Sequence, residues 1–342
     1  MKTNMRPPVS VPHDDVLPVG TANPRPKVPT RMLPLLATFV LFVMAFGAGS
    51  ARYDGFASGQ VVANLFIDNA FLIVIAVGMT FVILTGGIDL SVGSVVALST
   101  MVAASGLQAG WPAAVVIAAV LAMGSGFGLL MGLVIHYFDI QPFIVTLAGM
   151  FLARGLCFVI SVESISIKDD TFRSIATSTI ELPGDIVITY AVVIALVVVA
   201  AAAYVLHLTR FGRTVYAVGG DEPSAMLMGL STARAKVGVY GISGFCSSLA
   251  GLLFTLYMLS GYSLHAVGME LDAIAAVVIG GTLLTGGVGY VLGSLIGVLV
   301  LGLIQTLISF EGTLSSWWTK IVIGVLLLVF IVMQRLILRK QP

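Results

Sequence analysis

Long apolar runs, separated by short polar breaks, dominate the chain. A helix needs about 20 mostly apolar residues to cross the ~30 Å hydrocarbon layer of a bilayer. The runs near that length are 33–50, 61–84, 90–107, 112–135, 143–162, 186–208, 237–259, 267–285, 288–309 and 319–334. The pattern therefore predicts an all-α integral membrane protein with about ten transmembrane helices.

Composition agrees with a bilayer rather than water as the main solvent. Hydrophobic residues make up 58% of the 342 positions and charged residues 10%, with a mean hydropathy of +1.07. Soluble domains carry roughly 25% charged residues, so a soluble interaction protein is excluded. The two cysteines, Cys157 and Cys246, lie in apolar runs and lack the spacing of a disulfide framework or a zinc site.

The two ends of the chain differ from its apolar middle. Residues 1–32 are rich in proline and poor in apolar side chains, which predicts a disordered cytoplasmic tail. A retained first span is favoured over a signal peptide, because the apolar run is long and follows this tail. We expect a membrane domain over 33–335 and a short cytoplasmic tail over 336–342.

Lys and Arg are distributed unevenly between the two sides of the predicted bundle. With the N-terminus inside, twelve lie in the first tail, the 209–236 loop and the last tail. The outer side holds four: Arg52, Lys168, Arg173 and Lys320. Because cytoplasmic loops carry an excess of positive charge, both termini are predicted to be cytoplasmic.

A ten-residue segment occurs twice. Residues 85–94 read TGGIDLSVGS and residues 285–294 read TGGVGYVLGS, with five identical positions. Six predicted spans separate the copies, so both would cross in the same direction and the chain would consist of two related halves. The paired glycines predict a tight cytoplasmic turn in each copy. Asp89 would cap the following helix, or serve in gating or coupling.

A few polar residues lie where a polar solute would pass. Arg154 falls near the middle of the fifth predicted span, where it must face protein or water, as a structural brace or as part of the pathway. Asp68 and Asn69 open the second span, and Glu270 and Asp272 open the eighth. We expect both groups at the outer mouth, where capping and solvation are the alternatives to solute binding.

No catalytic arrangement is present in the sequence. No set of His, Cys or carboxylates has metal-ligand spacing, and no phosphate-binding Gly-x-x-x-x-Gly-Lys-[Ser/Thr] loop occurs. The chain is therefore predicted to be a non-enzyme without cofactor. Energy for transport would come from another subunit, or from an ion gradient if the chain is a secondary transporter of a small polar solute.

The 209–236 loop, the longest on the cytoplasmic side, is the candidate contact with such a subunit. Asp221 and Pro223 predict the start of a short helix there, and Gly229 predicts its end. The helix would expose three apolar side chains, Met226, Leu227 and Leu230. Lying on the membrane surface and docking into a partner protein are the two interpretations, and we favour docking.

Three of these stretches resemble a known family. Residues 85–94, 147–155 and 210–220 are similar to the sugar permeases of ATP-binding-cassette (ABC) importers in the ribose, xylose and galactofuranose group. The resemblance covers 33–335 and implies a multi-pass permease of the bacterial inner membrane. It also implies three kinds of partner: two cytoplasmic ATPase subunits that bind ATP and Mg²⁺, a periplasmic or extracellular sugar-binding protein, and a second permease copy or paralogue. Nucleic acid is not a partner.

Four segments are most similar to galactofuranose permeases: 69–72, 88–91, 270–274 and 312–320. The resemblance thus implies import of a monosaccharide by alternating access, with galactofuranose favoured and ribose or another pentose or hexose as the alternative. By the same resemblance, the ATPase coupling residues are Asp221, Glu222, Pro223, Met226, Leu227 and Leu230. The pathway or gate candidates are Asp68, Asn69, Asp89, Arg154, Glu270 and Asp272.

Overall fold

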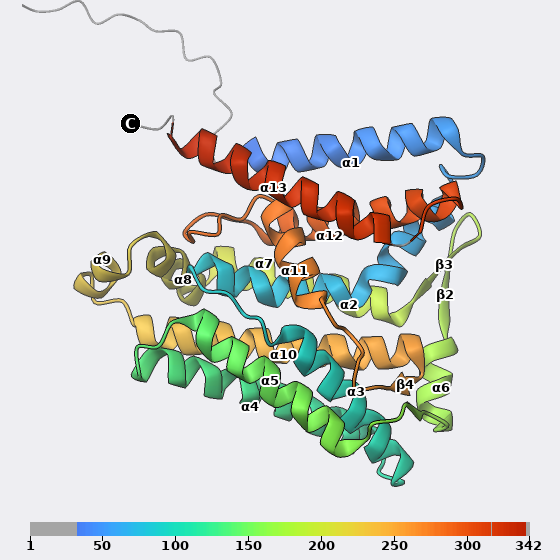
Figure 1. The fold of residues 1–342 in the computed structure, drawn as a ribbon, viewed down its shortest axis with the longest axis horizontal. Coiled ribbons are helices and arrows are strands. Elements are labelled where there is room, and N and C mark those ends of the chain that lie inside the picture. Colours follow the sequence, from blue (N-terminus) through green and yellow to red (C-terminus); the bar gives the residue numbers. More distant parts are fainter. Residues whose placement is uncertain (1–32, 316, 340–342) are drawn as a thin grey trace, which may run out of the picture.

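The computed structural model describes residues 33–315 and 317–339, which form a helical bundle with two short two-stranded sheets (Figure 1). The helices are α1 (Leu33–Arg52), α2 (Gly59–Leu84), α3 (Val92–Gln108), α4 (Ala113–Tyr137), α5 (Pro142–Ile160), α6 (Asp170–Thr177), α7 (Tyr190–Leu208), α8 (Arg210–Gly220), α9 (Glu222–Leu227), α10 (Thr232–Met258), α11 (Met269–Ile279), α12 (Val291–Glu311) and α13 (Trp317–Arg339). The strands are β1 (Ile165–Ser166), β2 (Thr179–Leu182), β3 (Ile186–Thr189) and β4 (Ser260–Gly261), with β1 antiparallel to β4 and β2 antiparallel to β3.

Among the residues that the structure describes, eight helices are long and apolar enough to cross a membrane: α1, α2, α4, α5, α7, α10, α12 and α13. They correspond to eight of the ten predicted spans. The ninth, α3, has 17 residues. The tenth, α11, has only 11 residues and rises about 16 Å, roughly half of the hydrocarbon thickness. The prediction of a full helical span over 267–285 is therefore wrong, because the helix ends at Ile279 and irregular backbone follows.

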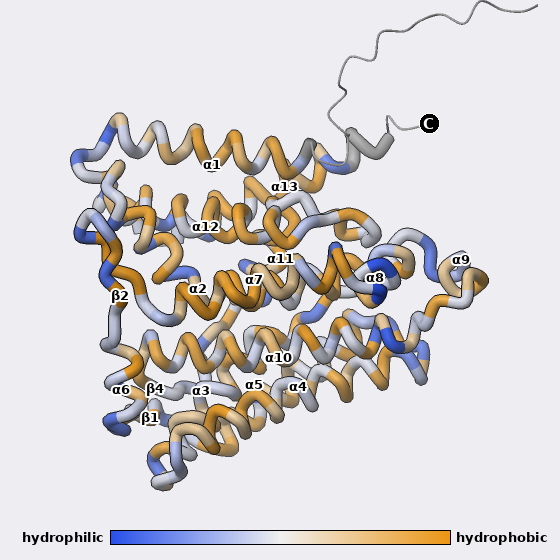
Figure 2. Tube along the Cα trace, turned by 180° about the vertical axis from the view of Figure 1, so that it is seen from behind, coloured by the Kyte–Doolittle hydropathy of each residue, from blue (hydrophilic) through white to orange (hydrophobic). Residues whose placement is uncertain are grey.

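α10 and α2 form the centre of the bundle. α10 packs against α4, α2 and α3, and α2 also packs against α12 and α7. In their most apolar stretches, 83% of the residues of α2 and 67% of those of α10 are buried, against 17% to 22% in α1, α5 and α13, as expected for helices that face lipid. Figure 2 shows apolar residues along the lengths of the helices and polar residues gathered at the two ends of the bundle.

Glycines bring α4 and α10 into backbone contact. A Cβ added at Gly124 would lie 2.6 Å from the carbonyl oxygen of Gly244, and one at Gly128 would lie 2.1 Å from that of Tyr240. These glycines, repeated every fourth residue, therefore let the two helix backbones approach closely.

Each end of the bundle carries its own small elements. α8 and α9 project at one end, and α6 with the β2–β3 hairpin covers the other (Figure 1). The start of α1 and the end of α13 both lie at the α8–α9 end. The predicted N-terminal tail, 1–32, and the last residues, 340–342, lie outside the described residues.

The two copies of the repeated segment interrupt the helices. α2 ends at Leu84 and is followed by a left-handed Gly86 (φ 78°), and the N–H of Gly87 donates to the carbonyl of Val82 over 3.1 Å. From there to Ser91 the backbone is not helical, and most of these residues are buried or half-buried. α3 begins at the next residue, Val92. The prediction of a tight turn therefore holds only for the first residues of this copy. The second copy lies between α11 and α12, and the N–H of Gly287 donates to the carbonyl of Leu84 over 2.9 Å.

Candidate functional site

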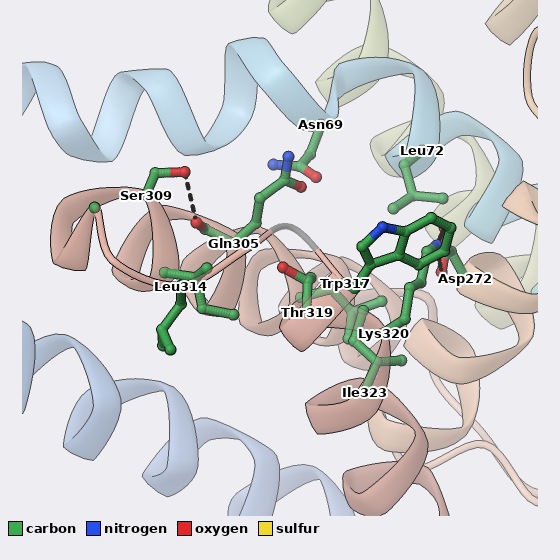
Figure 3. A pocket seen from close by; sticks show the side chains of 13 residues that line it. Asn69, Leu72, Asp272, Gln305, Ser309, Leu314, Trp317, Thr319, Lys320 and Ile323 are labelled. Atoms are coloured by element: carbon green, nitrogen blue, oxygen red, sulfur yellow. Dashed lines mark hydrogen bonds and ion pairs between the residues drawn. The ribbon is translucent and has the colours of Figure 1, made fainter.

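Two adjoining cavities, of about 450 and 480 Å³, lie between α2, α11 and α12. The first extends to α13, and the second to α10. Both are lined by Asn69, Leu72, Asp272, Gln305 and Ser309, and we refer to them together as the polar cavity. Figure 3 shows Asn69 and Gln305 pointing toward each other, with Trp317 and Lys320 approaching from α13. The polar cavity is thus built by amide, hydroxyl, charged and aromatic groups from several helices.

The charged groups of the polar cavity have partners. Lys320 Nζ lies 2.7 and 2.6 Å from the two carboxylate oxygens of Asp272. The hydroxyl of Tyr257 donates to Asp68 over 3.3 Å. Asn69 donates from its side-chain nitrogen to the carbonyl of Leu65 over 2.9 Å, which leaves its side-chain oxygen directed at the cavity. Such a lining can exchange hydrogen bonds with a hydroxyl-rich solute.

The structure brings together three of the pathway candidates, Asp68, Asn69 and Asp272, which all line the polar cavity. Asp68 and Asn69 do not open α2 as predicted, because α2 begins at Gly59 and both residues lie about two and a half turns inside it.

Other lining residues were missed by the sequence interpretation. Trp317, which was not among the pathway candidates, lines the polar cavity. Gln305 and Ser309 were also missed, although their spacing of four in an otherwise apolar span places them on one helix face, which was a usable signal.

Two candidates lie elsewhere, around the loop that leads into α11. Arg154 Nη1 donates to the carbonyls of Ser263 and His265 over 2.6 and 2.8 Å. The Oε2 atom of Glu270 is buried and has no hydrogen-bond partner among the described residues, and it lies where a side chain on Gly93 of α3 would be. Neither residue lines the polar cavity. Arg154 is placed as a brace between α5 and this loop.

Asp89 lies in the buried stretch between α2 and α3. One carboxylate oxygen accepts hydrogen bonds from the N–H and the hydroxyl of Ser91 over 2.9 and 2.6 Å. The other accepts from the hydroxyl of Ser243 on α10 over 2.7 Å. Asp89 therefore fixes the turn before α3 and joins it to α10, away from the polar cavity.

α9 begins as predicted. The Asp221 side chain caps it by accepting the N–H of Ser224 over 2.8 Å, and this hydrogen bond lowers the pKa of Asp221 below its ordinary value. Pro223 lies in the first turn, and Gly229 follows the end with φ 76°. Lys236 Nζ lies 2.7 Å from Glu222, which ties α9 to α10.

The apolar side chains of α9 differ in exposure. Met226 and Leu227 are 60% and 90% exposed. The prediction that Leu230 is exposed is wrong. The chain turns after Gly229 and packs Leu230 against Val218 and Ala225. Met228 is exposed in its place. In the residues the structure describes, no group of three or more His, Cys, Asp or Glu could hold a metal ion.

Comparison with a family model and with known proteins identifies similarity to transport permeases in each case. Residues 61–331 match the family described as "Branched-chain amino acid transport system / permease component". The chain is 49% identical over 306 residues to the inner membrane ABC transporter permease protein YjfF of Escherichia coli K12, covering 89% of this chain and 92% of that protein.

Two further relatives cover most of this chain. The fructose import permease protein FruG of Bifidobacterium longum is 44% identical over 91% of this chain and 93% of its own length. The ribose import permease protein RbsC of Haemophilus influenzae is 38% identical over 85% of this chain and 90% of its own length. No solved structure gives a significant match.

Proposed function

The chain belongs to the family of ABC-importer permease components, and on this premise we propose that its cargo is a monosaccharide. As such a component it is a non-catalytic translocation subunit that carries no cofactor, with ATP bound by a partner ATPase. The family assignment favours ATP as the energy source over the ion-coupled alternative.

The lining of the polar cavity is the observation that best supports a sugar as the cargo. The family description names amino acids, whereas the two relatives named for a substrate are named for fructose and ribose import. A zwitterionic amino acid would need an available cation and an available anion. Among the described residues that line the polar cavity, the only cation, Lys320, is paired with Asp272, so no cation is available for a carboxylate. Asp68 keeps its charge and accepts a hydrogen bond from Tyr257. The amide and hydroxyl groups that remain suit a neutral, hydroxyl-rich solute.

Galactofuranose is the sugar we favour, on the similarity of 69–72, 88–91, 270–274 and 312–320 to galactofuranose permeases. Ribose or another pentose or hexose is the alternative. Two of these segments, 69–72 and 312–320, contribute Asn69, Leu72, Trp317 and Lys320 to the polar cavity. That position supports a role in contact with the solute.

We also propose ten membrane crossings with both termini in the cytoplasm. Eight crossings are the long helices, and two are interrupted passes: residues 85–108, which end in α3, and residues 259–290, which contain α11. Irregular backbone is tolerated at membrane depth only where protein or water satisfies it. The buried hydrogen bonds of Asp89 and of Gly287 supply that satisfaction.

The proposed partners are cytoplasmic ATPases at α9, a sugar-binding protein at the opposite end, and a second permease copy. Exposure of Met226 and Leu227 supports docking of α9 into an ATPase groove. Glu substitution at both positions should abolish uptake and sugar-stimulated ATP hydrolysis while membrane insertion stays normal. Met226→Leu with Leu227→Met, which keeps both positions apolar, is the matched control and should leave both activities unchanged. Full activity of the Met226→Glu/Leu227→Glu variant would exclude docking through α9.

The substrate is tested with the chain co-expressed with the ATPase and binding-protein genes that adjoin its own gene. Uptake of radiolabelled galactofuranose, ribose, fructose and leucine is compared in cells that lack their own importers for these solutes. We expect competition-sensitive uptake of one monosaccharide and none of leucine. Leucine uptake would overturn the sugar assignment, and absence of adjoining ATPase and binding-protein genes would count against the complex we propose.

A further inference from the structure

The C-terminal end of α8 lies against the end of α2, directly before the first copy of the repeated segment, and against the second copy. A Cβ added at Gly219 would lie 1.7 Å from the carbonyl oxygen of Leu84 and 2.6 Å from the backbone nitrogen of Gly287. Both atoms belong to backbone, which cannot move aside as a flexible side chain can. No residue with a side chain therefore fits at position 219 without displacing one or both copies.

Hydrogen bonds close the same contact. The N–H of Gly287 donates to the carbonyl of Leu84 over 2.9 Å, which joins the second copy to the last residue of α2, directly before the first copy. The hydroxyl of Tyr216, one turn earlier on α8, donates to the carbonyl of Gly289 over 2.7 Å. A Cβ at Gly286 would lie 2.8 Å from the nitrogen of Gly86. We call this three-way contact of residues 84–87, 216–219 and 286–289 the glycine junction.

Both interrupted passes lead away from the glycine junction. Five residues after Leu84, Asp89 is bonded to Ser91 at the start of α3 and to Ser243 on α10. Two residues after Gly289, α12 begins, and a Cβ on its Gly293 would lie 2.1 Å from the carbonyl oxygen of Gly280, the residue that follows α11. Rigid contacts therefore run from α8 to α3 in one direction and to α11 and α12 in the other.

We infer that Gly219 and Tyr216 are positioning residues, which transmit a displacement of α8 and α9 to both interrupted passes at once. The inference rests on the proposed docking of an ATPase at α9. Close-packed backbone transmits such a movement because it has little room to deform before its neighbours move. A single contact that joins both passes makes them change together, as a switch between two global states requires.

The chain supplies a matched control at the next position. Nothing lies within 4 Å of a Cβ added at Gly220, which shares the same helix end. Alanine raises helix propensity at both positions, so a loss found only in Gly219→Ala reflects the contact and not the helix. Tyr216→Phe removes one hydroxyl and adds no atoms. It is the second test variant if the Gly219→Ala protein does not insert into the membrane.

The first readout needs no partner. Hydrogen exchange of residues 280–290 is measured on the purified chain in lipid nanodiscs, for wild type and each variant. Gly219→Ala should speed exchange of the Gly287 amide by about tenfold or more, because it opens the hydrogen bond to Leu84. Gly220→Ala should match wild type. Equal protection in Gly219→Ala and Gly220→Ala would overturn the junction itself.

The second readout is made on the complex with its ATPase and binding protein in proteoliposomes. Gly219→Ala should bind the ATPase and hydrolyse ATP, yet import sugar at a tenth of the wild-type rate or less, roughly the loss of 1.4 kcal/mol of coupling. The quantity compared is the number of sugar molecules imported per ATP hydrolysed. Tyr216→Phe should lower this ratio, as Gly219→Ala does. Normal ratios in both variants would overturn the inference. Failure of the wild-type complex to import sugar with ATP would instead refute the proposed function.

Discussion

The polar cavity and the glycine junction differ in the atoms that form them. Side chains from several helices form the cavity, and its key contacts are the Asp272–Lys320 ion pair and the facing Asn69 and Gln305. Backbone atoms form the junction, where Gly219 contacts Leu84 and Gly287 with no side chain between them. One region has space of several hundred cubic ångströms for a solute, and the other has no space for a methyl group.

This difference has a consequence for how each region tolerates change. A cavity lined with side chains loses single hydrogen bonds when it is mutated, so its affinity for a solute can be adjusted in small steps. A glycine in contact with neighbouring backbone has no side chain to shorten. A substitution there can only add atoms, which pushes the helix and the neighbouring backbone apart. We therefore expect graded effects on uptake from the polar cavity and abrupt structural effects from the glycine junction.

The largest effect is expected from Gly286→Ala. This position combines φ 86° with a Cβ only 2.8 Å from the nitrogen of Gly86. Gly110→Ala is the matched control, because it has φ 80° and nothing within 4 Å. Left-handed backbone costs each alanine about 1–2 kcal/mol, and overpacking adds about 1–3 kcal/mol at Gly286 alone. Thermal unfolding in detergent measures the difference, and equal melting temperatures would refute the tight contact.

Next in size is the loss of a solute hydrogen bond in the polar cavity. Asn69→Leu and Gln305→Leu should each raise the half-saturating sugar concentration for uptake about tenfold, because each removes roughly 1–1.5 kcal/mol of hydrogen bonding. The maximal rate should change little. Gln108→Leu, on an exposed residue at the end of α3, controls for the loss of an amide. Unchanged half-saturation in both cavity variants would remove the polar cavity from the pathway.

Much of this contrast was visible in the sequence and part of it was not. The apolar runs predicted ten spans, and eight of them correspond to long helices among the described residues. Hydropathy treats an interrupted pass as a full span, because the irregular residues near Gly287 are still small and apolar. The α11 region was therefore mistaken for a long helix.

The candidate site was predicted in part for a similar reason. Asp68, Asn69 and Asp272 are unusual in apolar runs, so composition alone identified them. The contribution of Trp317 depends on how α13 packs beside α11, which local sequence does not contain. Contacts of Gly219 with Leu84 and Gly287 likewise join residues far apart in the chain. The repeat indicated that both copies matter, but not that they touch.

A smaller effect is expected from the ion pair at the polar cavity. Lys320→Ala should reduce uptake by up to about fivefold, because a partly exposed pair contributes at most about 1 kcal/mol. Exchanging the charges, Asp272→Lys with Lys320→Asp, should restore part of the loss. Arg52→Ala breaks a pair with Glu311 that does not line the cavity, and it should leave uptake unchanged. A loss as large in Arg52→Ala would assign the effect to stability.

The smallest effect is a pH dependence confined to α9. The folded-state pKa of Asp221 is lowered by its bond to Ser224, so its capping contribution is present at neutral pH. That contribution is lost as pH falls from about 3.9, the ordinary value, through the lowered folded value. Hydrogen exchange of 222–228, corrected for intrinsic rates, should rise on the acid side in wild type. Asp221→Asn keeps a capping oxygen that does not titrate, and an identical rise there would exclude Asp221 as the cause.

The most direct test of the account measures sugar uptake and ATP hydrolysis together in proteoliposomes that contain the chain, its ATPase and its binding protein. We predict that uptake requires ATP inside the compartment that α9 faces, and that ionophores which collapse proton and sodium gradients leave it unchanged. Uptake that continues without ATP and stops when an ion gradient is collapsed would contradict the account.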